Sequence, residues 1–120
     1  MKTLLTVTAI LEGSTGVALL FAPALAVSLL LGSSLAEPTG IVVGRLAGVT
    51  LISLTITCWM YRNEEHNAGG VVKSLLFYNI AAAALLVYAG TSGFPGLAIW
   101  PVSLLHAAMA VWCIKSLQKK

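Results

Sequence analysis

Four strongly polar side chains stand inside long apolar stretches of the sequence, one in each stretch: Glu12, Arg45, Asn79 and His106. A charged group deep in a bilayer costs at least about 2.5–3.5 kcal/mol, so such groups are normally paired, neutralised or functional. At a helical rise of about 1.5 Å per residue, Glu12, Asn79 and His106 fall near the bilayer midplane and Arg45 falls nearer the outer surface. The sequence therefore predicts a polar cluster inside a membrane protein.

The simplest arrangement of this cluster pairs Glu12 with Arg45, because a long arginine side chain can extend inward. Asn79 and His106 would complete a hydrogen-bonded group around the pair. One interpretation is that the cluster only fixes the register of the helices, as interhelical polar contacts do. The other is a midplane binding site or proton path, because ionisable residues inside membranes are functional by default. The sequence leaves both open.

Motifs for catalysis are missing from the sequence. It has no phosphate-binding loop, zinc-protease motif or catalytic-triad spacing, and Glu12 is the single carboxylate in an apolar stretch. We expect no catalytic residue, no metal site and no cofactor. A bis-histidine heme would need a symmetric dimer that shares two copies of His106, since His66 lies in a polar connector. Cys58 and Cys113 are expected to be small, buried packing residues.

The composition excludes most other classes of protein. Hydrophobic residues make up 58% of the 120 residues and charged residues only 9%, against about 25% charged in a soluble domain. So few charged residues cannot cover the exposed surface of a small soluble domain. A disordered chain would need many charged residues and few apolar ones. The net charge of +3 forms no basic stripe interleaved with aromatic residues, so we expect no nucleic-acid partner. The partner is the lipid bilayer.

Apolar segments of sufficient length define one domain, residues 1–120, with four spans. A helix needs about 20 apolar residues to cross a bilayer, and four segments qualify: about 3–21, 41–61, 71–89 and 97–117. Turn-forming residues separate them. The pattern predicts an all-α, integral membrane four-helix bundle with up-down topology.

A short apolar run, about 24–31, follows the first span and is too short to cross the membrane. It predicts either a continuation of the first helix past a kink at Pro23 or a helix at the membrane interface. Its start, Ala24-Leu25-Ala26, resembles a signal-peptide cleavage site. We expect the first span to stay uncleaved, because Glu12 sits in the middle of its apolar stretch.

Glycines in the second span indicate close helix packing. Gly40, Gly44 and Gly48 recur every four residues, and such a thin face lets another backbone approach in a membrane. A face of this kind, with tiny regions outside the membrane, favours a module that packs in a homo-oligomer or a larger membrane complex.

Lysine and arginine predict the orientation. With four spans, the residues near the chain ends and the long connector fall on one side: Lys2, Arg62, Lys73, Lys115, Lys119 and Lys120. Loops on the other side carry no Lys or Arg. The positive-inside rule therefore places both termini in the cytoplasm.

A series of short motifs runs along nearly the whole chain: Glu12-Gly13, Gly44-Arg45-Leu46-Ala47-Gly48, Cys58-Trp59, Tyr78-Asn79, Trp100-Pro101, Leu105-His106 and Trp112-Cys113. In these motifs the chain resembles a group of small four-span bacterial membrane proteins without an assigned activity. It is more distantly similar to DoxX-like proteins, some of which are linked to quinone-dependent sulfur oxidation. The resemblance implies a protein of the bacterial inner membrane that is not an enzyme on its own, and it carries over no catalytic residue.

The sequence thus supports three functions. The first is an accessory or structural module of a membrane complex or homo-oligomer. The second is a site for a quinone, lipid or other apolar small molecule, lined by Glu12, Arg45, Tyr78, Asn79 and His106. The third is a proton-linked transporter unit, which would need an oligomer because four spans are few for a pore.

Overall fold

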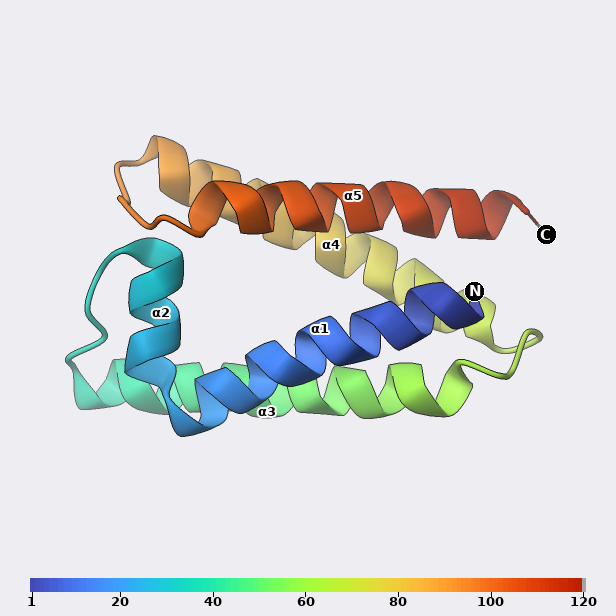
Figure 1. The fold of residues 1–120 in the computed structure, drawn as a ribbon, viewed down its shortest axis with the longest axis horizontal. Coiled ribbons are helices and arrows are strands. Elements are labelled where there is room, and N and C mark those ends of the chain that lie inside the picture. The colour runs from blue at the N-terminus through green and yellow to red at the C-terminus, as the bar shows by residue number, and fades with distance from the viewer. Residues whose placement is uncertain (120) are drawn as a thin grey trace.

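The structure, a computed structural model, describes residues 1–119, and this part of the chain is folded into helices without strands (Figure 1). The helices in chain order are α1 (Lys2–Phe21), α2 (Pro23–Leu31), α3 (Pro38–Tyr61), α4 (Ala68–Thr91) and α5 (Ile99–Gln118). Within residues 1–119, α1, α3, α4 and α5 are long and apolar enough to cross a membrane. The expected all-α fold with four spans is confirmed, and it indicates a multi-pass membrane protein.

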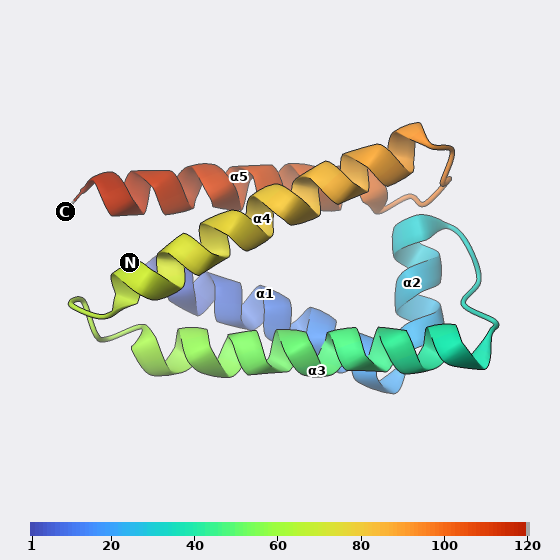
Figure 2. The ribbon, with the colours of Figure 1, turned by 180° about the vertical axis from the view of Figure 1, so that it is seen from behind.

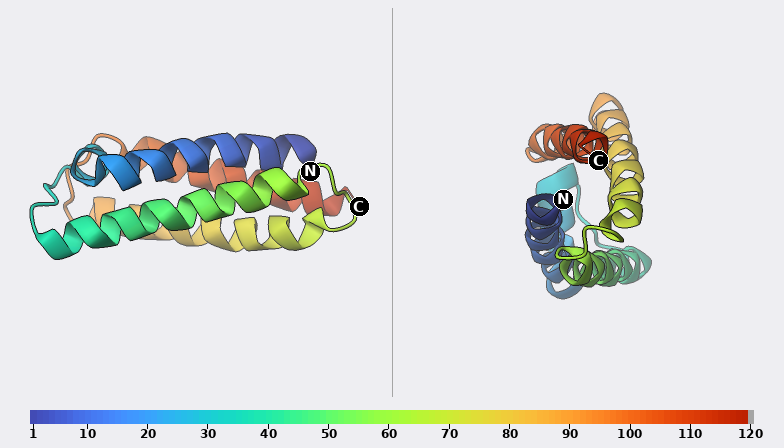
Figure 3. Two further views of the ribbon diagram at one scale, coloured as in Figure 1. Left: turned by 90° about the horizontal axis from the view of Figure 1, so that it is seen from below. Right: turned by 90° about the vertical axis from the view of Figure 1, so that its right-hand side faces the viewer.

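The four long helices run alternately up and down. Both termini lie at the same end of the molecule, as Figures 1 and 2 show, and the end-on view of Figure 3 shows the helices in a ring in the order α1, α3, α4, α5. α1 packs closely along α3, and α4 along α5, whereas contacts between these two pairs are far fewer. The bundle is therefore built from two tightly packed helix pairs that meet more loosely.

The short helix α2 is separate from α1. The chain leaves the α-conformation at Ala22 (φ −136°, ψ 57°), because the residue before a proline is disfavoured there, and Pro23 then starts α2 at its first turn. Figures 1 and 2 show α2 running across the bundle, steeply inclined to the spans and standing between the two helix pairs. α2 is therefore a helix of its own and not a continuation of the first span.

The far end of α2 is fastened to the connector between α4 and α5. α2 ends at Gly32, whose φ of 68° suits a glycine C-cap. The backbone N–H of Ala98 donates to the carbonyl of Leu29 at 3.3 Å. Gly96 lies so close to the carbonyl of Leu30 that a Cβ atom there would overlap it. α2 therefore links the first helix pair to the second at the end opposite the termini.

The glycines of α3 face α1 and α2. A Cβ atom on Gly48 would lie 2.7 Å from both the carbonyl oxygen of Gly16 and the backbone nitrogen of Leu20, and one on Gly44 would lie 3.1 Å from Cβ of Pro23. Gly40 packs against the side chain of Leu35 in the loop before α3. These glycines thus allow contacts inside the chain, and that surface is not free for a second copy.

The packed core lies at the end that holds the termini. Its side chains come from all four spans and are almost completely buried: Leu4, Leu5, Ala9, Cys58, Ala68, Val72, Leu75, Met109 and Cys113. Toward the other end the two helix pairs are held apart by α2 (Figure 1). The bundle is therefore tightly packed in the half that holds the termini, and its two helix pairs are separated in the half that holds α2.

Candidate functional site

Glu12 and Tyr78 connect the two helix pairs. Glu12 projects from the middle of α1 and is 8% exposed. The hydroxyl of Tyr78, on α4, donates to Oε2 of Glu12 at 3.0 Å. A tyrosine hydroxyl is a neutral donor, so it solvates one carboxyl oxygen without supplying a compensating charge.

Asn79 and His106 form a second polar contact, between α4 and α5. Asn79 is 1% exposed, and its Nδ2 donates to the carbonyl of Leu75 at 2.8 Å. Because that carbonyl can only accept, the amide oxygen Oδ1 must face the other way, toward Nδ1 of His106 at 2.8 Å. A neutral imidazole carries one proton, so this contact places it on Nδ1 and leaves Nε2 as an acceptor.

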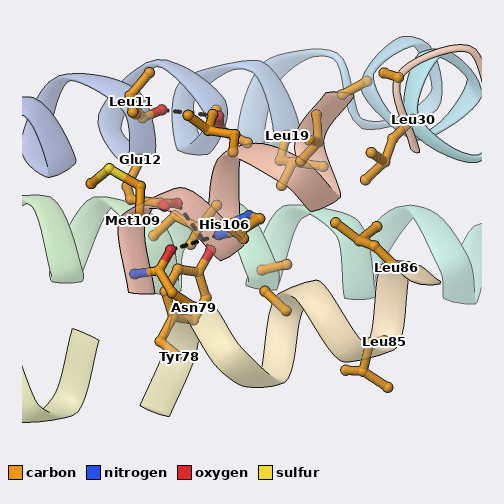
Figure 4. Close-up of a pocket in the computed structure, with 18 of the residues that line it drawn as sticks. Leu11, Glu12, Leu19, Leu30, Tyr78, Asn79, Leu85, Leu86, His106 and Met109 are labelled. Carbon is orange, nitrogen blue, oxygen red and sulfur yellow. Dashed lines mark hydrogen bonds between the residues drawn. The ribbon is translucent and has the colours of Figure 1, made fainter. Parts of the chain in front are cut away.

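The two contacts lie side by side. The rings of Tyr78 and His106 meet edge to face, with centroids 5.5 Å apart and planes inclined by 86°, as aromatic pairs prefer. Figure 4 shows Glu12, Tyr78, Asn79 and His106 gathered at one place, contributed by three different helices. Four of the five polar residues singled out from the sequence are therefore brought together; we call them the polar cluster.

Arg45 is the exception, and the expected pairing of Glu12 with Arg45 must be corrected. Arg45 is exposed on α3, and within residues 1–119 the carboxyl of Glu12 has Tyr78 as its hydrogen-bond partner and no cation beside it. Thr55 of α3 packs against Gly13, next to Glu12. Ten residues separate Thr55 from Arg45, which is about 15 Å along the helix and beyond the reach of an arginine.

Double-mutant cycles will distinguish the observed contact from the expected one. Arg45→Leu should change stability by no more than about 0.5 kcal/mol, because the side chain has no buried partner, and its effect should add to that of Glu12→Gln. Tyr78→Phe and Glu12→Gln should instead be coupled by about 0.5–3 kcal/mol, as groups in contact are. Thermal unfolding of the three single and two double variants in one detergent measures both cycles. Coupling between positions 12 and 45 would contradict the contacts described above.

A cavity of about 820 Å³ opens beside the polar cluster. α1 and α3 line it with Leu11, Glu12, Thr15, Leu19, Ala47, Thr50 and Leu51. α2 contributes Ala26, Val27, Leu29 and Leu30. The remaining wall comes from α4, α5 and the residue before α5: Tyr78, Asn79, Ala82, Leu85, Leu86, Ala98, Val102, Leu105, His106 and Met109. A volume of this size suits a drug-sized ligand.

The cavity has a polar end and an apolar end. In Figure 4 the polar cluster lies at one end, and Leu30, Leu85 and Leu86 lie toward the other. Met109 lines the cavity beside the polar cluster and also belongs to the packed core, so the core closes the cavity toward the termini. The space is therefore closed toward the termini and extends from the polar cluster toward α2.

The sequence did not indicate the apolar wall of this cavity. Leu11, Thr15 and Leu19 follow one face of α1, and Asn79, Ala82 and Leu86 follow one face of α4, at the spacing that any inward helix face has. The sequence predicted α2 as a kinked continuation of the first span or as an interfacial helix, and neither interpretation places its residues in a cavity wall. In the sequence, only the polar residues inside apolar stretches indicated a site. They indicated the polar end of the cavity and not its apolar wall.

Cys58 and Cys113 are both free and fully buried in the core. In the described part of the chain, residues 1–119, no three side chains of His, Cys, Asp or Glu come together as a metal site would require. Comparison of the chain with family models, curated proteins and solved structures gives no match. The function is therefore argued from the residues of this chain alone.

Proposed function

We propose that this protein binds one amphiphilic small molecule within the membrane. Its apolar body would lie in the cavity, and its polar head would lie on the polar cluster. The observation that carries the proposal is the cavity of about 820 Å³ between the helix pairs, with Glu12, Tyr78, Asn79 and His106 at one end and apolar walls elsewhere. Ligand pockets have this design: mostly apolar, with a few converging polar groups.

A purely structural cluster would not need this space. Membrane helices associate through close packing, and an open space of this size between the helix pairs gives up such contacts. Here α2 holds the helix pairs apart at the end of the cavity away from the polar cluster. The accessory role inferred from the glycines loses its main support, because Gly44 and Gly48 pack against α1 and α2 of the same chain. A proton path is also less favoured, because the core closes the pocket toward the termini.

A bulky side chain in the cavity should abolish binding. Ala82 lines the cavity, whereas Ala84 on the same helix is exposed and does not. Ala82→Phe should therefore displace the bound molecule, while Ala84→Phe should leave it in place. Native mass spectrometry of protein extracted with its surrounding lipid measures the bound mass. The same molecule at equal occupancy in Ala82→Phe, or an empty wild-type protein, would overturn the proposal.

We further propose that the protein lies in the bacterial inner membrane with both termini in the cytoplasm, as its lysines and arginines and its resemblance to DoxX-like proteins suggest. Figure 1 places the termini at the same end of the molecule, where the α3–α4 loop also lies. Reporter fusions at Asn67 and at the C-terminus should therefore read as cytoplasmic, and one at Gly93 as external. An external signal at Asn67 would overturn this orientation. In the proposed orientation the cavity lies toward the outer leaflet, since α2 lies at the end opposite the termini.

A further inference from the structure

We infer that the head of the bound molecule is a cation, an ammonium group on an apolar body, and that it takes the place of a proton on Glu12. This inference rests on the proposed function, since it concerns the occupant of the same cavity. Three features of the polar cluster carry it: a buried carboxyl without a cation, a second acceptor held beside it, and aromatic rings around both.

Glu12 lacks a compensating charge within the chain. Among residues 1–119 no lysine or arginine pairs with it, and Arg45 is exposed about 15 Å away along α3. Tyr78 donates to Oε2, and within the same residues Oε1 has no hydrogen-bond partner although Glu12 lines the cavity. A carboxylate in an apolar membrane site is neutralised either by a proton or by a cation. The cavity provides room for the cation.

His106 supplies a second acceptor. The contact with Asn79 fixes the proton on Nδ1, so the bare Nε2 is available to a ligand. Oε1 of an ionised Glu12 and Nε2 of His106 would then both accept hydrogen bonds, and an ammonium can donate to both. A carbonyl head could accept from a protonated Glu12, but it has no donor for Nε2 of His106. A carboxylate head would place a second negative charge next to Glu12.

The surroundings also suit a positive charge. Tyr78 and His106 present aromatic rings at the cluster, and a cation is attracted to the face of an aromatic ring such as that of tyrosine. The remaining titratable group near Glu12 is the thiol of Cys58 on α3, which is not a cation. Within residues 1–119, a protonated His106 would be the one positively charged group beside Glu12.

Cation binding and proton binding should therefore compete. In the empty site Glu12–COOH is neutral. When an ammonium ligand enters, the O–H bond breaks, the proton leaves to solvent and the ammonium pairs with the carboxylate. The site is electrically neutral in both states, so neither state leaves an isolated buried charge.

Three probes of equal size test this inference: phenylbutylamine, phenylbutanol and phenylbutanoate. Isothermal titration of the protein in nanodiscs, with empty nanodiscs subtracted, measures each affinity. At a pH at which Glu12 of the empty site has lost its proton, the amine should bind about 100-fold more tightly than the alcohol, the factor expected for compensating one membrane-buried charge, and the carboxylate should not bind. Amine affinity should rise by about tenfold per pH unit while Glu12 is protonated. Titrations in buffers of different ionisation enthalpy should show one proton released per amine bound.

Glu12→Gln should abolish both the preference for the amine and the proton release, while alcohol binding persists. Glu37→Gln, at the exposed cap of α3, is the matched control and should behave like wild type. The proton count uses the wild-type protein, so the inference stays testable even if Glu12→Gln fails to fold. Equal binding of all three probes, blocked by Ala82→Phe, would overturn the cationic head and leave the cavity function intact. Binding of none of them would overturn both.

Discussion

Replacing Gly48 with alanine should destabilise the protein by about 1–3 kcal/mol, the usual cost of forcing extra volume into a packed interior. The added Cβ atom would lie 2.7 Å from the carbonyl oxygen of Gly16 and 2.7 Å from the backbone nitrogen of Leu20. Both neighbours are backbone atoms of α1, so no side chain can rotate away. α1 and α3 would have to separate along the closest contact in the first helix pair.

Gly70→Ala is the control for this substitution. Gly70 lies in the first turns of α4, and a Cβ atom there would meet nothing within 4 Å. Alanine is favoured over glycine in a helix by about 0.5–1 kcal/mol, so Gly70→Ala should leave stability unchanged or raise it. Thermal unfolding of the two variants in the same detergent compares them. A Gly48→Ala protein as stable as Gly70→Ala would show that α1 and α3 do not cross at this glycine.

The same crossing explains why the spans and much of the polar cluster could be predicted but the partner of Glu12 could not. Helix length and hydropathy depend on local composition, so the four spans were predicted to within three residues of their ends. Pairing depends on how far α1 and α3 slide past each other. Gly16 and Gly48 set that register through backbone contact, and it places Arg45 far from Glu12. The position of each residue along its own helix can be counted from the sequence, but the register between α1 and α3 cannot.

The cavity could not be predicted from the sequence for a related reason. It exists because α2 crosses between the helix pairs and is fastened to the α4–α5 connector by Gly96 and the carbonyl of Leu29. Both contacts join residues far apart in sequence, and the close approach at Leu30 depends on the small size of Gly96 and not on hydropathy. A proline followed by a short apolar run predicts a helix. It does not predict that this helix crosses between the two helix pairs and separates them.

Asn79 differs from Glu12 and His106 in what it contributes to the polar cluster. Asn79 orients His106 through a backbone carbonyl, so its role is to position the imidazole. Glu12 and Nε2 of His106 are the groups left to meet a ligand. Stability and binding should therefore respond differently to changes at position 79, and this difference yields the second large effect that we expect.

Asn79→Leu should lower stability by about 1–3 kcal/mol, the cost of leaving a buried donor without its acceptor. Leucine has a similar volume but cannot accept from Nδ1–H of His106, and Asn79 is 1% exposed, so water cannot replace the amide oxygen. The variant should also bind the occupant of the cavity less tightly, because the imidazole is free to turn or to change its tautomer. Thermal unfolding and titration with phenylbutylamine measure the two effects.

Adding His106→Phe to Asn79→Leu separates the two contributions. Removing both partners leaves no unpaired donor, and such a replacement is often close to neutral, so the double variant should be more stable than the sum of the single losses predicts. Binding should not recover, because Nε2 is gone. Additive losses of stability would mean that Asn79 and His106 do not form a hydrogen bond. Recovered stability with wild-type affinity would mean instead that the imidazole does not contact the bound molecule, and Glu12 alone would hold its head.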